Sequence, residues 1–167
     1  IRGLTRRETD RIGNFWVDVT RAAVYVLLPI CIVGALFLCS QGVIQNLKPY
    51  TAVTTVEGAK QTIAQGPVAS QEVIKELGTN GGGFFNTNSS HPFENPTPLT
   101  NFFEMWLLLV VSAALAYTFG VMVGDTRQGW AILAAFLVMA LIGVFVCYGF
   151  EAPGNPILAK LGLQTTA

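Results

Sequence analysis

Charged side chains are scarce in this chain. Only 12% of its 167 residues are Asp, Glu, Lys or Arg, whereas soluble domains carry about 25%. Three long stretches hold no ionised side chain at all: residues 22–47, 105–124 and 128–150. Together with 51% hydrophobic residues and a mean hydropathy of +0.50, this scarcity excludes an ordinary soluble domain and predicts a protein of the lipid bilayer.

The charge-free stretches are long enough to cross a membrane as helices. A hydrocarbon core of about 30 Å is spanned by about 20 helical residues. We therefore predict an all-α membrane protein with transmembrane helices at roughly residues 20–44, 98–123 and 129–150, and a kink at Pro29 that neighbouring helices tolerate.

Sequence signatures of catalysis and nucleotide binding are also lacking. Neither a GK[ST] phosphate-binding loop nor a DKTGT phosphorylation motif occurs, so no nucleotide site is expected. The single histidine, His91, follows Ser89 and Ser90 without an acid to orient it, and we expect no catalytic residue. A formal net charge of zero gives no reason to expect nucleic-acid binding. The three cysteines lie in the apolar stretches without CxxC spacing, which favours buried, unreactive thiols.

The positions of the basic residues predict the orientation. Arginines are concentrated in segment 1–19, and Arg127 lies in the short turn between the last two spans, so both regions should be cytoplasmic. The loop at about 45–97 and the tail 151–167 should then face outside. The loop is slightly acidic, which predicts an external surface that attracts cations; its charged residues are Lys48, Glu57, Lys60, Glu72, Lys75, Glu76 and Glu94.

The outside loop contains a pattern typical of an ion-binding loop. Residues 70–77 predict a short helix that begins with Ser70 as N-cap and stops at Gly78. Its C-terminal end would direct the negative pole of the helix dipole toward segment 78–83, where three consecutive glycines leave the backbone free to present carbonyl oxygens to a cation. Alone, the glycines are more typical of a flexible surface turn, but the membrane context favours the ion-binding loop.

Two further features flank this loop. Thr97 and Pro98 suit the N-cap and first position of the second span. Glu104, in that span, is expected to snorkel toward the interface, and Asp18 to pair with Arg21. Gly66, in the outer loop, is expected to lie apart from the ion-binding loop, so that its replacement should leave ion preference unchanged.

A resemblance to a known family is carried by GPVASQEVIKELGTNGGGFFNTNSSHPFENPTPLTNFFE, with SQGVIQNLKPY at 40–50 and GDTRQG at 124–129. Together these segments resemble the potassium-translocating A subunit of the Kdp-type potassium-transporting ATPase. The resemblance implies a repeat of helix, re-entrant pore loop and helix over 20–123, as in the Trk, Ktr and HKT transporters. Residues 129–150 would then be the first helix of a following repeat.

The same resemblance implies a role for each loop residue. Thr79, Asn80, Gly81 and Gly82 would give backbone carbonyls to K⁺, and Gly78, Gly83 and Asn88 would support the loop. The remaining repeats of the subunit would complete the filter. A P-type ATPase subunit would hydrolyse ATP, beside small accessory subunits, in a bacterial-type plasma (inner) membrane.

Two other interpretations are open. The chain could form a homotetrameric cation channel by itself, although its third span has no place in a simple helix, loop, helix channel. It could also be a membrane scaffold that transports nothing and binds a partner through its outside loop, in which case the glycines would tolerate substitution.

Overall fold

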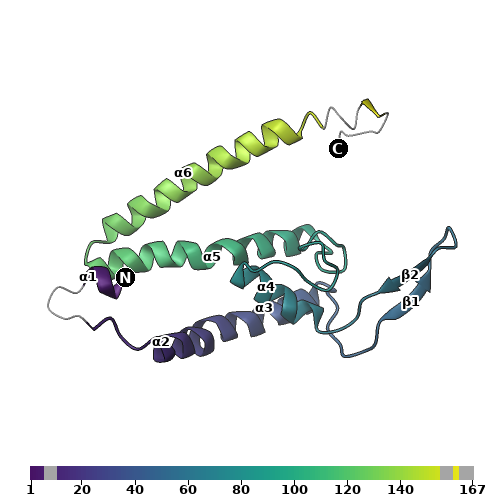
Figure 1. Cartoon of the computed structure of the whole chain (residues 1–167), viewed down its shortest axis with the longest axis horizontal. Helices are drawn as coiled ribbons and strands as arrows, with labels where there is room; N and C mark the ends of the chain where they lie inside the picture. The colour runs from purple at the N-terminus through teal and green to yellow at the C-terminus, as the bar shows by residue number, and fades with distance from the viewer. Residues whose placement is uncertain (6–10, 155–159, 162–167) are drawn as a thin grey trace. The chain divides into compact units, whose positions relative to one another are not determined.

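The computed structural model describes residues 1–5, 11–154 and 160–161, and most of them are helical. Three helical runs are long and apolar enough to cross a membrane: Phe15–Ser40, Pro98–Val123 and Thr126–Glu151. The prediction of an all-α membrane protein is confirmed (Figure 1). Parts of the expected cytoplasmic segment (6–10) and outside tail (155–159 and 162–167) lie outside the described residues.

The first run begins and ends earlier than the predicted 20–44. It consists of α2 (Phe15–Arg21), a π-helical turn η1 (Ala22–Leu27) and α3 (Leu28–Ser40). Asn14 caps it by accepting hydrogen bonds from Trp16 N and Val17 N. The π-helical turn lies just before Pro29. Proline has no N–H to donate, and its ring would crowd the carbonyl four residues earlier in a regular α-helix. Pro29 therefore explains why the helix widens here.

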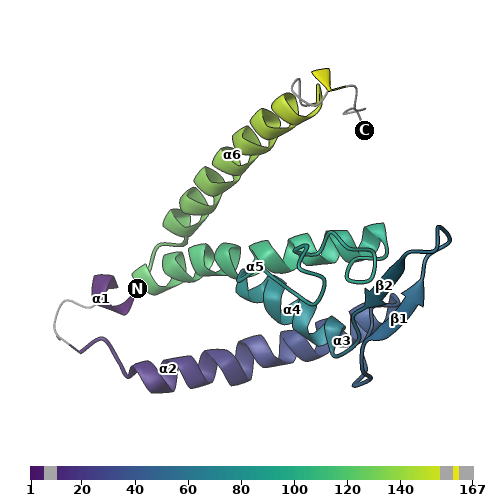
Figure 2. The same cartoon turned by 45° about the vertical axis from the view of Figure 1, so that its right-hand side comes forward.

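The chain divides into two compact units, and one of them comprises Arg2 and residues 6–114. Its core is formed by α3, α4 (Val68–Gly78) and the first half of α5 (Pro98–Val123). Figures 1 and 2 both show α4 beside α3. The two helices approach closely because Gly34 has no side chain: a Cβ there would lie 2.8 Å from Val73 Cγ1. The buried apolar residues of this core are Leu38, Val43, Val68, Ala69, Val73, Leu77 and Leu107.

A β-hairpin that the sequence analysis did not predict interrupts the outside loop. Strands β1 (Thr51–Thr54) and β2 (Lys60–Ile63) are antiparallel, with Thr51 opposite Ile63. β-Branched residues on both sides of a Glu-Gly pair are the sequence signal for it. Gly58 in its turn has a φ of +84°, and a Cβ there would have no neighbour within 4 Å.

The other unit contains the turn between the last two spans. Asp125 caps α6 (Thr126–Glu151) by accepting a hydrogen bond from Arg127 N at 3.0 Å. Gly120 and Gly129 face each other across the turn, and a Cβ on Gly120 would lie 2.8 Å from Gly129 N. The short turn that contains Arg127 is therefore held by a helix cap and by two glycines that allow the two helix backbones to approach closely.

Candidate ion-binding loop

The helix before the glycines, α4, spans Val68–Gly78 and begins before the predicted Ser70. Ser70 is not its N-cap, because Pro67 holds that position without a side-chain cap. Ser70 Oγ instead donates to the Pro67 carbonyl at 3.0 Å. The first helical N–H groups are bound from the preceding chain: Ala69 N donates to Ile44 O at 2.9 Å, and Ser70 N to Gln45 Oε1 at 3.1 Å.

The C-terminal end of α4 turns sharply into the loop. Thr79 adopts a left-handed conformation with a φ of +53°, and Asn80 N donates to the Lys75 carbonyl at 3.3 Å. Gly81, Gly82 and Gly83 follow with φ values of +71°, +89° and +128°. Three consecutive residues in the region that L side chains avoid explain why the sequence has three glycines here.

Each residue predicted for the ion site has a distinct environment. Residues 78–82 are exposed, although most of α4 before them is buried. A Cβ on Gly81 would lie 3.4 Å from Asn88 Oδ1, whereas one on Gly82 would have no neighbour within 4 Å. The structure thus brings Asn88 behind Gly81, and it leaves segment 78–82 accessible on the surface of this chain.

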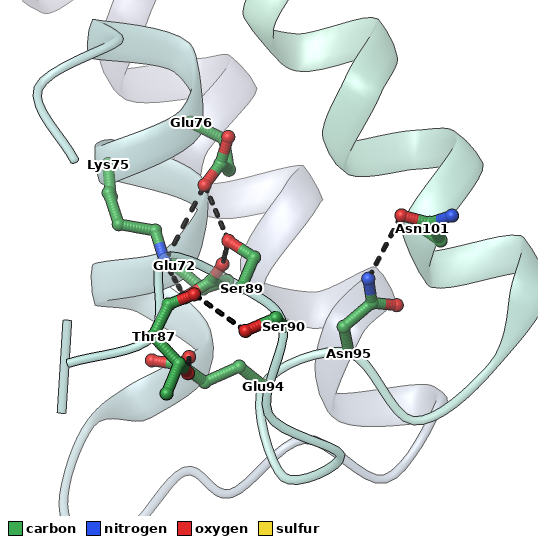
Figure 3. Close-up of polar contacts among 9 residues, drawn as sticks. All are labelled: Glu72, Lys75, Glu76, Thr87, Ser89, Ser90, Glu94, Asn95 and Asn101. Carbon is green, nitrogen blue, oxygen red and sulfur yellow. Dashed lines mark hydrogen bonds and ion pairs between the residues drawn. The ribbon is translucent and has the colours of Figure 1, made fainter. Parts of the chain in front are cut away.

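Gly83 joins the loop to a set of buried charges. A Cβ there would lie 2.6 Å from Glu94 Oε1 and 3.4 Å from Lys75 Nζ. Lys75 is 1% exposed and Glu72 is 0% exposed. Lys75 Nζ lies 2.7 Å from Glu72 Oε2 and 3.5 Å from Glu76 Oε1. We name Glu72, Lys75, Glu76, Glu94 and Ser89 the charge cluster; Figure 3 shows these side chains converging from α4 and the following loop.

The charge cluster corrects the prediction of an acidic external surface. Four of the seven charged residues counted there are buried: Glu72, Lys75, Glu76 and Glu94. Lys75 pairs with Glu72 and Glu76 across short distances. The exposed loop that remains carries Lys48, Glu57 and Lys60.

Ser89 links the two carboxyl groups of α4. Its hydroxyl contacts Glu72 Oε1 and lies 2.6 Å from Glu76 Oε1. A hydroxyl has one hydrogen to donate, so both contacts are hydrogen bonds only if one of the carboxyls carries a proton and donates it to Ser89. Burial raises the pKa of Glu72, while hydrogen bonds from Lys75 and Ser89 oppose the rise. A raised pKa of Glu72 is the direction expected if one carboxyl of this pair is protonated.

Sequence reasoning missed the charge cluster for a physical reason. Glu72, Lys75 and Glu76 follow an i, i+3, i+4 pattern, which does place them on one face of a helix. The same spacing is usual on a solvated face, and nothing local shows that Ser89 and Glu94 fold back over it. The His91 ring stacks on that of Phe85 with their centroids 4.3 Å apart, and His91 Nδ1 accepts a hydrogen bond from Phe93 N.

The end of the loop is fixed where α5 begins. Thr97 Oγ1 accepts a hydrogen bond from Thr100 N at 3.1 Å, so the predicted cap before Pro98 is confirmed. Asn95 Nδ2 donates to Asn101 Oδ1 at 3.1 Å, which also joins the loop to the helix (Figure 3). The return segment from Asn88 is therefore tied to α4 at one end and to α5 at the other.

Comparison with known proteins agrees with the resemblance. The family model described as "Potassium-transporting ATPase A subunit" matches residues 1–167. The chain belongs to this family. It is 63% identical over 163 residues to the potassium-transporting ATPase potassium-binding subunit of Solibacter usitatus (strain Ellin6076), covering 98% of this chain and 29% of that protein.

Other relatives give the same family. The subunit of that name from Koribacter versatilis (strain Ellin345) is 57% identical over 184 residues, which cover 100% of this chain and 31% of the relative. The subunit from Methylobacterium nodulans (strain LMG 21967 / CNCM I-2342 / ORS 2060) is 61% identical over 164 residues, covering 98% of this chain and 29% of the relative. The chain thus spans about a third or less of the A subunits that it matches.

Proposed function

We propose that this chain contributes one of four selectivity-filter loops to the K⁺-translocating A subunit of an ATP-driven K⁺ uptake complex. The observation that carries the proposal is the run of left-handed glycines, Gly81 to Gly83, directly after the C-terminal end of a buried helix. A helix C-terminus favours a nearby cation, and backbone free of side chains can present carbonyl oxygens in place of a hydration shell.

In this proposal the backbone carbonyls of Thr79, Asn80, Gly81 and Gly82 coordinate K⁺. Gly78, Gly83 and Asn88 hold the loop in shape. The exposure of residues 78–82 supports this assignment, because a filter loop must face an ion path that other repeats of the subunit enclose. Asn88 behind Gly81 and the charge cluster behind Gly83 supply rigid support.

The same proposal assigns the rest of the chain. Residues 20–123 form one repeat of helix, pore loop and helix, with the loop outside and both ends cytoplasmic, and α6 opens the next repeat. The partners are the remaining repeats, a P-type ATPase catalytic subunit and small accessory subunits in a bacterial inner membrane. ATP is bound and hydrolysed on the catalytic subunit.

Reconstitution tests this function against a homotetrameric channel. The full-length subunit, assembled with its ATPase partner in liposomes, should take up K⁺ when ATP is supplied. The 167-residue chain alone should conduct nothing, because one loop cannot enclose an ion. Selective K⁺ flux through the purified chain alone would contradict the proposal and favour the homotetramer.

The depth of the pore helix is tested by thiol accessibility. Ile74 on α4 is 55% exposed in this chain, and Val56 in the hairpin turn is fully exposed. In a cysteine-free full-length subunit, Val56→Cys should react with a membrane-impermeant thiol reagent. Ile74→Cys should react at least about tenfold more slowly, because the other repeats and the bilayer should cover it.

The choice of Ile74 matters for this test. Val73 and Leu77 are buried within the chain, so a cysteine there would be protected whatever the depth of the helix. Equal reaction rates at Ile74→Cys and Val56→Cys would show that α4 is a surface helix, and the scaffold interpretation would gain support.

A further inference from the structure

An open cavity of about 640 Å³ lies between the end of α4, the return segment of the loop and the first turns of α5. Glu76 and Ser89 of the charge cluster line one part of it, and Asn101, Glu104, Met105 and Leu108 of α5 line another. Asn88, which lies behind Gly81, also lines the cavity, but the proposed coordinating residues 79–82 do not. The cavity is therefore separate from the carbonyls proposed to bind K⁺.

Glu104 gives the cavity its chemical character. The residue is only 3% exposed, so the expectation that it snorkels toward the interface is wrong. Among the described residues, neither of its carboxylate oxygens has a hydrogen-bond partner, and both are buried. A buried carboxylate without a partner is strongly unfavourable, and an ionisable group in a membrane-spanning helix normally has a counter-charge.

The local charges do not balance without a further positive group. Four carboxyls are buried in this region, those of Glu72, Glu76, Glu94 and Glu104, and Lys75 is the one buried cation among the described residues. Lys75 Nζ lies beside both Glu72 and Glu76, and the Ser89 hydroxyl contacts both carboxyls. Glu94 Oε2 accepts a hydrogen bond from Thr87 Oγ1 at 3.4 Å, while its Oε1 is buried without a hydrogen-bond partner among the described residues. In Glu104 both carboxylate oxygens lack a hydrogen-bond partner among the described residues.

We propose that this cavity is a second cation site, in which Glu104 binds a positively charged group. Two sources have the required chemistry: a lysine or arginine side chain from the part of the subunit outside this chain, or a free univalent cation. Met105 and Leu108 offer an apolar wall for the methylene stem of a basic side chain. Ser90, Asn95 and Asn101 add polar side chains to the lining of the cavity. The proposal does not depend on the filter assignment.

The test is a structure of the full-length subunit in its assembled complex, determined with Tl⁺ in place of K⁺ so that anomalous scattering locates the ion. An anomalous peak against the Glu104 carboxylate identifies a free cation. A lysine or arginine nitrogen within about 4 Å of Glu104 identifies the side-chain source. Either result supports the proposal. Only water or apolar atoms against Glu104 would overturn it.

A pair of variants adds a second structural test. Glu104→Gln keeps the shape of the side chain but removes its charge, and it should abolish the Tl⁺ peak in the cavity or displace the basic side chain. Glu57→Gln removes the same charge from an exposed position and should leave the cavity unchanged. Tl⁺ in the filter should persist in both variants, so failure of this proposal is distinguishable from failure of the filter assignment. If Glu104→Gln does not assemble, the wild-type structure still decides.

Discussion

Replacing Gly81 with serine in the full-length subunit should weaken K⁺ affinity about tenfold and reduce discrimination against Rb⁺ and Na⁺. Gly81 has a φ of +71°, with Asn88 Oδ1 3.4 Å from the position of an added Cβ. A residue other than glycine in this conformation costs roughly 1–2 kcal/mol, and about 1.4 kcal/mol is a factor of ten in affinity. Relaxation of the backbone would move the carbonyls that we propose coordinate K⁺.

This prediction is checked by K⁺-dependent ATPase activity and ion competition in the assembled complex. Gly58→Ser is the matched control, because Gly58 also has a positive φ but lies in the hairpin turn with no neighbour within 4 Å. Gly66, whose replacement the sequence predicts to leave ion preference unchanged, is unsuitable as a control because a Cβ there would lie 2.8 Å from Phe84 Cε1. Wild-type affinity and selectivity in folded Gly81→Ser would exclude Gly81 from the filter.

The sequence predicts those features that are set by local chemistry. Uninterrupted apolar stretches require membrane helices, and consecutive glycines indicate backbone that only glycine adopts, as Gly81 to Gly83 show. The cap at Thr97 follows from two adjacent residues. Such features depend on residues within one turn of each other, so no knowledge of the tertiary structure is needed.

Features that depend on distant contacts were not predictable in this way. Ser70 looks like an N-cap, but Ile44 and Gln45 already bind the first N–H groups of α4. Glu72 and Lys75 look like solvated charges until Ser89 and Glu94 fold over them. Glu104 looks like a snorkelling residue at a helix end, yet the loop buries it. In the first two cases a partner distant in sequence replaces water, whereas Glu104 is buried without a hydrogen-bond partner among the described residues.

Lys75→Met should be the most destabilising single substitution in the charge cluster. Methionine fills similar space but leaves Glu72 and Glu76 without the ammonium group now 2.7 Å and 3.5 Å away. Removing one partner of a buried ion pair costs about 3–5 kcal/mol. The variant should therefore unfold several degrees below the wild type in a thermal-unfolding assay of the assembled complex, and it should also weaken K⁺ affinity, because Lys75 Nζ lies 3.4 Å from a Cβ placed on Gly83.

Two further variants test whether the loss of stability in Lys75→Met comes from burial of the charge and its pairing with Glu72. Lys60→Met removes an exposed lysine from the hairpin, and its unfolding temperature should match the wild type, since exposed charges contribute at most about 1 kcal/mol. Combining Lys75→Met with Glu72→Gln removes both members of the shorter of the two ion pairs in the charge cluster and should recover part of the lost stability. If the double variant were as unstable as the two single losses added together, the charges would act independently, and the coupling between Lys75 and Glu72 that holds the base of the loop would be refuted.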